Sequence, residues 1–139
     1  MNRSFFVFLL ASVSLRADPM LIAHRGLLQH APENTLPAFA TCLELEMGFE
    51  LDIRTTKDGK LVVLHDATLG RTTDGPDEPV TKFTFTELSK FDAGSWFDPR
   101  FTGVRVPSLE ETFALVKERK RRPTLLALNV KGITRDGER

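Results

Sequence analysis

The first half of the chain alternates short apolar runs with stretches of polar residues. Residues 21–24 form a brief apolar run that ends in a polar residue, which is typical of a buried strand. Residues 49–54 alternate apolar and polar positions, as a half-buried strand does. Residues 61–64 and 125–130 are two further apolar runs, so the pattern predicts four strands.

A helix is predicted between the first two strands. From Asn34 to Met47, apolar residues recur at helical spacing. Asn34 or Thr35 is the expected N-cap, and Gly48 is the expected end of the helix.

A second helix is predicted before the last strand. Ser108 and Glu111 have the spacing of a capping box, and Leu109, Phe113 and Val116 are expected to form the buried face. Strands that alternate with helices, with long loops after strands, predict an α/β fold with a parallel sheet.

Residues 67–107 lack this regularity. Glycine, proline, threonine and aspartate dominate there, and only residues 86–90 have the pattern of a short helix. About forty residues without strong periodicity inside a compact domain usually mark an inserted loop or subdomain with a function.

Composition narrows the class of protein without assigning a function. The 139 residues suffice for one domain with a modest core. Nineteen basic residues balance nineteen acidic ones, so bulk charge favours neither nucleic-acid nor membrane-surface binding. The single cysteine, Cys42, excludes an internal disulfide, and its place in a helical pattern indicates a small core residue.

Residues 1–17 have the pattern of a secretory signal peptide. An arginine near the start precedes an apolar run that is shorter than the ~20 residues needed to cross a bilayer, so no stable membrane span is expected. If the signal is real, the protein is exported, to the periplasm or the outside of the cell. Alternatively, translation begins at Met20 and the protein is cytoplasmic.

Two carboxylates lie two residues apart on the second predicted strand. Glu50 and Asp52 therefore point to the same face, and they repel each other unless a cation lies between them. Oxygen-only ligation of this kind suits Mg²⁺ or Ca²⁺ rather than zinc. Alternatively, the pair lies on a solvent-facing strand edge. Phe49, Leu51 and Ile53 occupy the other face, so in a barrel the carboxylates would line the interior, where charges need a partner or a function.

Two of the three histidines follow predicted strands. His24 and His65 lie where α/β folds place their active sites, and imidazoles that titrate near neutrality can act as general base and general acid. Arg25 offers a planar donor fork for a phosphate, and Lys131 could add a second positive charge. Asp66 is either an orienting partner of the preceding histidine or a loop cap.

These residues lie within a series of motifs that resembles the glycerophosphodiester phosphodiesterase family. The matching segments, in family order, are AHRG at 23–26, PENT at 32–35, ELD at 50–52, TKDG at 56–59, HD at 65–66, LGRTT at 69–73, GSWF at 94–97, PSLEE at 107–111 and KG at 131–132. They extend from about residue 21 to the end of the chain. The resemblance implies a TIM-barrel-type phosphodiesterase fold, with residues 67–107 as the family's inserted subdomain.

The resemblance also implies a reaction and a role for each candidate residue. The reaction is metal-dependent hydrolysis of a glycerophosphodiester to glycerol 3-phosphate and an alcohol, with Mg²⁺ or Ca²⁺ as the cation. The implied roles are acid/base catalysis by His24 and His65, phosphate binding by Arg25 and Lys131, and metal ligation by Glu50 and Asp52.

Two features depart from the family pattern. The family usually carries a glutamate as third acidic metal ligand, and this chain has Asn129 at that position. An amide oxygen can still ligate a hard cation but brings no net charge, which predicts weaker metal binding. The second feature is length, because a complete barrel has about 250 residues and eight strands. Residues 20–139 are therefore expected to form only the N-terminal half of the barrel, either as a fragment or as a chain that self-associates to close it.

Three functions follow from this pattern, and the first is favoured. It is hydrolysis of a small glycerophosphodiester, with no nucleic-acid partner. A sphingomyelinase-D-like phospholipase of the same superfamily is the nearest enzymatic alternative, against which the segment GSWF at 94–97 argues. An inactive, truncated anion-binding module is the third, because of Asn129 and the short chain.

Overall fold

The computed structural model describes residues 20–132, which form one four-stranded sheet around a central strand, β2 (Gly48–Thr55). Strands β1 (Ile22–Ala23) and β4 (Leu126–Val130) are parallel to β2 on opposite sides of it. Strand β3 (Leu61–Val63) is antiparallel to the far end of β2. The predicted signal peptide lies outside the described residues.

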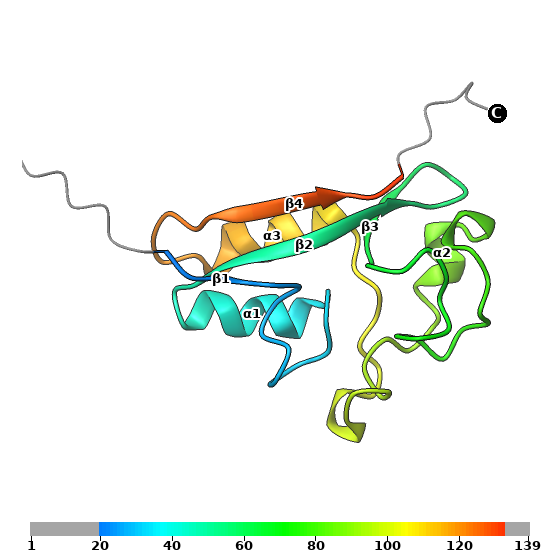
Figure 1. The fold of residues 1–139 in the computed structure, drawn as a ribbon, viewed down its shortest axis with the longest axis horizontal. Helices are drawn as coiled ribbons and strands as arrows, with labels where there is room; N and C mark the ends of the chain where they lie inside the picture. The colour runs from blue at the N-terminus through cyan, green and yellow to red at the C-terminus, as the bar shows by residue number, and fades with distance from the viewer. Residues whose placement is uncertain (1–19, 133–139) are drawn as a thin grey trace, which may run out of the picture.

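The two longer helices pack side by side against the sheet, as Figure 1 shows for α1 (Leu36–Glu44) and α3 (Leu109–Arg119). The core beneath them contains Phe49, Leu51 and Ile53, which are at most 3% exposed. The prediction that these three side chains lie opposite the carboxylates of β2 is therefore confirmed. None of the helices within residues 20–132 has the length and apolarity needed to cross a membrane.

Helix α1 ends earlier than predicted. The helix stops at Glu44, and Glu46 turns the chain with a left-handed backbone (φ 55°), while the Met47 N–H donates to the Cys42 carbonyl at 2.9 Å. Gly48 is instead the first residue of β2, where a Cβ would lie 2.7 Å from the Leu125 carbonyl oxygen. The glycine serves the close approach of two strands and not the end of the helix.

Helix α3 begins with the predicted capping box, but its buried face is rotated from the predicted one. Leu109 and Val116 pack against the core as expected, whereas Phe113 is 42% exposed. Thr112 is fully buried in its place and donates from Oγ1 to the Ser108 carbonyl at 3.0 Å. Positions 109, 112 and 116 lie on one stripe of the helix, and residue 113 lies a further 100° around it.

The direction of β3 was not predicted from the sequence. The Thr56 N–H donates to the Lys60 carbonyl at 2.9 Å and closes a tight hairpin, which is too short for the crossover that a parallel strand needs. Three of the four strands are therefore parallel in the described part of the chain. On its other side, β3 meets the start of α3, because Val62 forms a bridge with Ser108.

Residues 67–107 have a small core of their own and lie beside β3 (Figure 1, green to yellow). Their short helices are η1 (Val80–Lys82), α2 (Phe85–Leu88) and η2 (Pro99–Phe101). The short helix expected over residues 86–90 corresponds to α2, which Thr84 and Glu87 cap. The buried side chains of this second core include Leu69, Val80, Leu88 and Val106, together with Val62 and Leu64 from the region of β3.

Candidate active site

The turn after β1 is fixed by its backbone. Arg25 and Gly26 both have positive φ angles, 55° and 87°. A Cβ on Gly26 would lie 2.7 Å from the Cβ of Ala38, so only glycine fits against α1 there. The Arg25 N–H donates to Glu50 Oε2 at 3.0 Å, which attaches this turn to the carboxylate face of β2.

Asp52 is fully buried, and both of its oxygens accept hydrogen bonds. The Asn34 side chain donates to Oδ2 at 3.0 Å and accepts from the Asp52 backbone N–H at 3.2 Å. Asn129 Nδ2 donates to Oδ1 at 3.0 Å from the paired position on β4. A buried carboxylate is costly without such partners, so these two amides are part of what keeps it there.

Two protein cations lie beside the same carboxylate. Lys131 Nζ is 3.3 Å from Asp52 Oδ1, and Arg25 Nε is 3.5 Å from Oδ2. Arg25 Nε is buried and makes no hydrogen bond within the described residues, so it retains a donor. The surroundings of Asp52 thus carry two positive charges for one negative charge, with Glu50 as the next acidic group on β2.

His65 is held both through its ring and through its backbone. Its Nδ1 lies 2.6 Å from Asp66 Oδ1, and its carbonyl accepts two hydrogen bonds from Arg54, at 2.9 and 2.6 Å. Of the two roles open for Asp66, the structure shows the orienting one. A carboxylate at Nδ1 favours the tautomer with hydrogen on that nitrogen, which leaves Nε2 able to take a proton.

A chain of alternating charges connects this histidine to the buried carboxylate. Arg71 binds Asp66 at 2.5 and 3.0 Å and Glu33 at 2.9 and 2.7 Å. Glu33 in turn accepts from Arg25 Nη1 at 3.1 Å. The complete series is Lys131, Asp52, Arg25, Glu33, Arg71, Asp66 and His65.

Arg71 favours the ionised form of the two carboxylates that it binds, Glu33 and Asp66. Burial alone would raise the pKa of Glu33, but hydrogen bonds and charge from Arg71 and then Arg25 outweigh burial and lower this pKa. Hydrogen bonds from Arg71 hold the pKa of Asp66 well below its usual range, against a smaller opposing effect of burial, and His65 adds to the lowering. Glu33 and Asp66 raise the pKa of Arg71 in return.

The structure brings some of the predicted site residues into contact with one another and leaves others apart. Arg25, Asp52 and Lys131 are in direct contact, together with Glu50 and Asn129, and His65 joins them through the chain of ion pairs. His24 is exposed in the turn directly after β1, and its ring makes no hydrogen bond or ion pair with any residue from 20 to 132.

Besides Arg54, three residues of this arrangement were given no role in the site from the sequence, which offered Asn34 only as a helix cap. They are Glu33, Asn34 and Arg71, which lie inside motifs that carry the family resemblance. Each bonds a residue distant along the chain, with a separation of 38 residues for Arg71 and Glu33 and 18 for Asn34 and Asp52. The one local signal is that Asn34 has a left-handed backbone (φ 56°), which asparagine tolerates better than most residues.

The predicted metal ligands have the donor chemistry of a site for a hard cation. Glu50 and Asp52 on β2, and Asn129 at the position paired with Asp52 on β4, supply carboxylate and amide oxygens. Over residues 20–132, no group of three or more His, Cys, Asp or Glu side chains is placed to hold a metal. Asn129 occupies the third position and turns its amide nitrogen toward Asp52.

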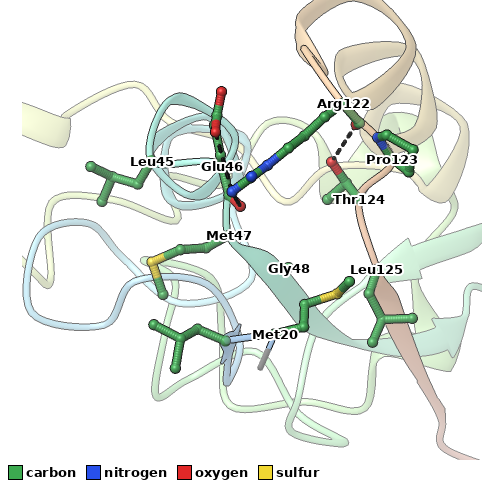
Figure 2. Close-up of a pocket in the computed structure, with 10 residues that line it drawn as sticks. Met20, Leu45, Glu46, Met47, Gly48, Arg122, Pro123, Thr124 and Leu125 are labelled. Carbon is green, nitrogen blue, oxygen red and sulfur yellow. Dashed lines mark hydrogen bonds and ion pairs between the residues drawn. The ribbon is translucent and has the colours of Figure 1, made fainter. Parts of the chain in front are cut away.

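A pocket lies at the opposite ends of the parallel strands (Figure 2). It is lined by residues that flank the amino ends of β1, β2 and β4, including Leu21, Gly48 and Leu125. Arg122 crosses it and contacts Glu46 through the backbone carbonyl and the carboxylate, both at 3.1 Å. None of the predicted site residues lines this pocket. Arg25 follows the carboxyl end of β1 and Lys131 that of β4, which places the candidate site at the carboxyl ends of the parallel strands.

Comparison with known proteins relates the chain to one family over most of its length. The family described as "Glycerophosphoryl diester phosphodiesterase family" matches residues 24–133. A glycerophosphodiester phosphodiesterase of Caldanaerobacter subterraneus is 48% identical over 101 residues, which are 72% of this chain and 41% of that protein. One from Bacillus subtilis is 42% identical over 101 residues, which are 66% of this chain and 34% of that protein. The chain thus spans between about one third and two fifths of the length of these two relatives.

Solved structures give the same relationship. A phosphodiesterase of Oleispira antarctica, in complex with the product sn-glycerol-3-phosphate, superposes with a TM-score of 0.75 at 35% identity, over 81% of this chain and 44% of that one. A glycerophosphodiester phosphodiesterase of Agrobacterium tumefaciens superposes with a TM-score of 0.73 at 38% identity, over 80% and 46%. The fold is the TIM-barrel phosphodiesterase fold over part of its length, and the chain belongs to the glycerophosphoryl diester phosphodiesterase family.

Proposed function

We propose that this protein is a phosphoric diester hydrolase that cleaves glycerophosphodiesters to glycerol 3-phosphate and an alcohol. The observation that supports this most is the joined arrangement of a cation pair, Arg25 and Lys131, with an oriented imidazole, His65. An anionic phosphodiester fits the cations, and the imidazole supplies the proton transfer that hydrolysis requires. The related phosphodiesterase in complex with sn-glycerol-3-phosphate supports the substrate class.

In the proposed mechanism, Arg25 and Lys131 bind the phosphate oxygens and stabilise the negative charge that develops on them. A water oxygen attacks phosphorus, and the bond from phosphorus to the alcohol oxygen breaks. One of the two histidines, His24 or His65, accepts the proton of the water, and the other donates a proton to the departing oxygen. Because Asp66 holds the Nδ1 side of His65, the Nε2 side of that ring exchanges the proton.

We further propose a divalent cation, Mg²⁺ or Ca²⁺, held by Glu50, Asp52 and Asn129. When bound, it would supply positive charge that offsets the charge of the phosphate. The donor oxygens are of the type that such ions prefer, and two carboxylates with one neutral amide favour weak binding over tight binding.

The proposed activity is tested by release of glycerol 3-phosphate from glycerophosphocholine, with Mg²⁺, with Ca²⁺ and with a chelator. We expect His24→Ala and His65→Ala to lower the rate by about 10²–10⁴-fold, because each removes one proton-transfer group. His30→Ala is the matched control, since His30 is the third histidine and is exposed outside the site. Full activity of both site variants would contradict the mechanism.

A second candidate function is an anion-binding module without turnover, which the hydrogen bond from Asn129 to Asp52 favours. In that case, a folded sample would release no product, yet phosphate would raise its melting temperature. A sphingomyelinase-D-like phospholipase is the third candidate, and cleavage of sphingomyelin in preference to glycerophosphocholine would identify it.

Self-association and export stay predictions. Within residues 20–132, β4 pairs with β2 alone, and Leu128 and Val130 on it are about half exposed. A free strand edge beside apolar side chains favours pairing with another chain, which sedimentation over a range of concentrations tests. Export depends on residues 1–17 and is tested by locating the protein with and without them.

A further inference from the structure

We propose that Arg71 is a positioning residue that orders the Asp66–His65 pair and connects it to the phosphate-binding Arg25 through Glu33. The residue comes from the segment 67–107, whereas the rest of the site lies on the strands and in the loops next to them. The consequence for turnover rests on the proposed function, whereas the consequence for the histidine ring rests on the geometry alone.

The guanidinium of Arg71 uses four of its five N–H donors on two carboxylates. Nε and Nη2 donate to Asp66, while Nη1 and Nη2 donate to Glu33, all between 2.5 and 3.0 Å. Only the planar fork of arginine can bind two carboxylates in this two-pronged way, because a lysine ammonium is a single point of charge. The geometry is therefore specific for arginine at this position.

Arg71 supplies most of the bonds that hold the Asp66 side chain. Among the residues that the structure describes, Asp66 makes three side-chain hydrogen bonds, two with Arg71 and one with Nδ1 of His65. Without the arginine, this carboxylate, which is about one quarter exposed, is free to turn toward water. The imidazole then loses the fixed acceptor that selects its tautomer.

The backbone around Arg71 is anchored, although its side chain is 45% exposed. Leu69, Thr72 and Thr73 are buried on either side of it. The Thr73 N–H and Oγ1 both donate to the Leu69 carbonyl, at 3.1 and 2.8 Å, and close the turn. The core of the segment 67–107 thereby determines where the guanidinium lies, and through it the orientation of His65.

The test compares Arg71→Gln and Arg71→Lys with Arg100→Gln in the full chain. Arg100 is a matched control, because it lies in the same segment and forms a similar two-pronged pair with Asp98, at 2.9 and 3.1 Å, with 82% of its side chain exposed. Long-range ¹H–¹⁵N NMR reports the tautomer of each ring, and a chain with three histidines gives few signals to assign.

We expect the wild-type His65 ring to carry hydrogen on Nδ1, and Arg71→Gln and Arg71→Lys to give a mixture of tautomers. We also expect Arg71→Gln to lower kcat on glycerophosphocholine by up to about 100-fold, with a smaller change in KM. Asp66→Asn should cause a similar loss, and the double variant should lose little more than either single one, because the arginine acts through the aspartate. Arg100→Gln should change neither signal nor rate.

An unchanged tautomer in both Arg71 variants would overturn the proposal, as would additive losses in the double variant. If the wild-type chain has no turnover, the proposed function fails, and the tautomer measurement still decides the role of Arg71. If Arg71→Gln does not fold, Arg71→Lys keeps the charge and provides the same NMR comparison.

Discussion

The two ends of the parallel strands hold their charges in different ways. At the amino ends, beside the pocket of Figure 2, Arg121 pairs with Glu44 and Arg122 pairs with Glu46, with all four side chains between 41% and 64% exposed. At the carboxyl ends, by contrast, Asp52 is fully buried and is contacted by cations and amides from three other segments of the chain.

The difference shows which charges the fold has to support. An exposed ion pair is worth little, because water solvates both partners almost as well. A buried carboxylate persists only where the surrounding donors compensate for lost hydration, and removing one partner leaves the others unpaired. The charges at the carboxyl ends are thus retained against a cost, which is typical of a functional site.

Among substitutions that test this difference between the two ends, Asp52→Ala is expected to have the largest effect on stability. The substitution leaves Arg25 and Lys131 without their shared partner and should lower the free energy of unfolding by about 3–5 kcal/mol. Glu46→Ala at the amino ends is the control and should stay within about 1 kcal/mol of the wild type. Urea denaturation measures both, and equal losses would remove the distinction between the two ends.

Lowering the pH is expected to reduce the stability of the protein by a smaller amount than Asp52→Ala does. The pKa values of Glu33 and Asp66 are lowered in the folded chain, so the unfolded chain binds more protons as these groups titrate. Their stabilising contribution is therefore complete above the unfolded pKa values of about 4 and is lost as the pH falls below them toward the folded values. Melting temperatures between pH 7 and pH 3 should fall steeply in the wild type and less in Arg71→Gln. An equal change of slope in Arg122→Gln would contradict the assignment to the carboxyl ends.

The smallest effect concerns the neutral third position of the proposed cation site. Asn129→Glu adds a carboxylate beside Glu50 and Asp52 and should tighten Mg²⁺ or Ca²⁺ binding by about tenfold or more. Each tenfold gain in affinity adds about 1.4 kcal/mol of stability at saturating metal, which thermal denaturation with and without the ion detects. Tight binding by the wild type that Asn129→Ala abolishes and Asn129→Glu leaves unchanged would contradict the charge argument.

Local patterns predicted the elements of the fold better than their arrangement. The alternation around Glu50 correctly separated the two faces of β2, because a strand has a period of two residues. The same reasoning gave no direction for β3, since periodicity carries no information about how a chain reverses. Phe113 was placed in the core because it is apolar, whereas the stripe that packs is chosen by the neighbours of α3.

In the candidate site, too, the roles of single residues were easier to predict than the contacts between them. The role of His65 was predicted from its residue type and its position after a strand, and that of Asp52 from its pairing with Glu50 on one face of a strand. The bonds from Arg71 to Glu33 and from Asn34 to Asp52 were not predicted, because they depend on the path of the chain between distant segments. The choice between two roles for Asp66 also needed coordinates, since a side chain next to a histidine can turn either way.

The segment 67–107 leaves and rejoins the fold at nearly the same place. It departs shortly after β3, and it returns at Pro107, whose carbonyl accepts from the Val63 N–H at 2.9 Å. Because the segment begins and ends beside the same strand, β3, the spacing between the strands of the barrel does not constrain its length or sequence. Changes inside this segment can therefore leave the parallel strands in place, whereas a change at Arg71 would reach Asp66 and, through it, His65.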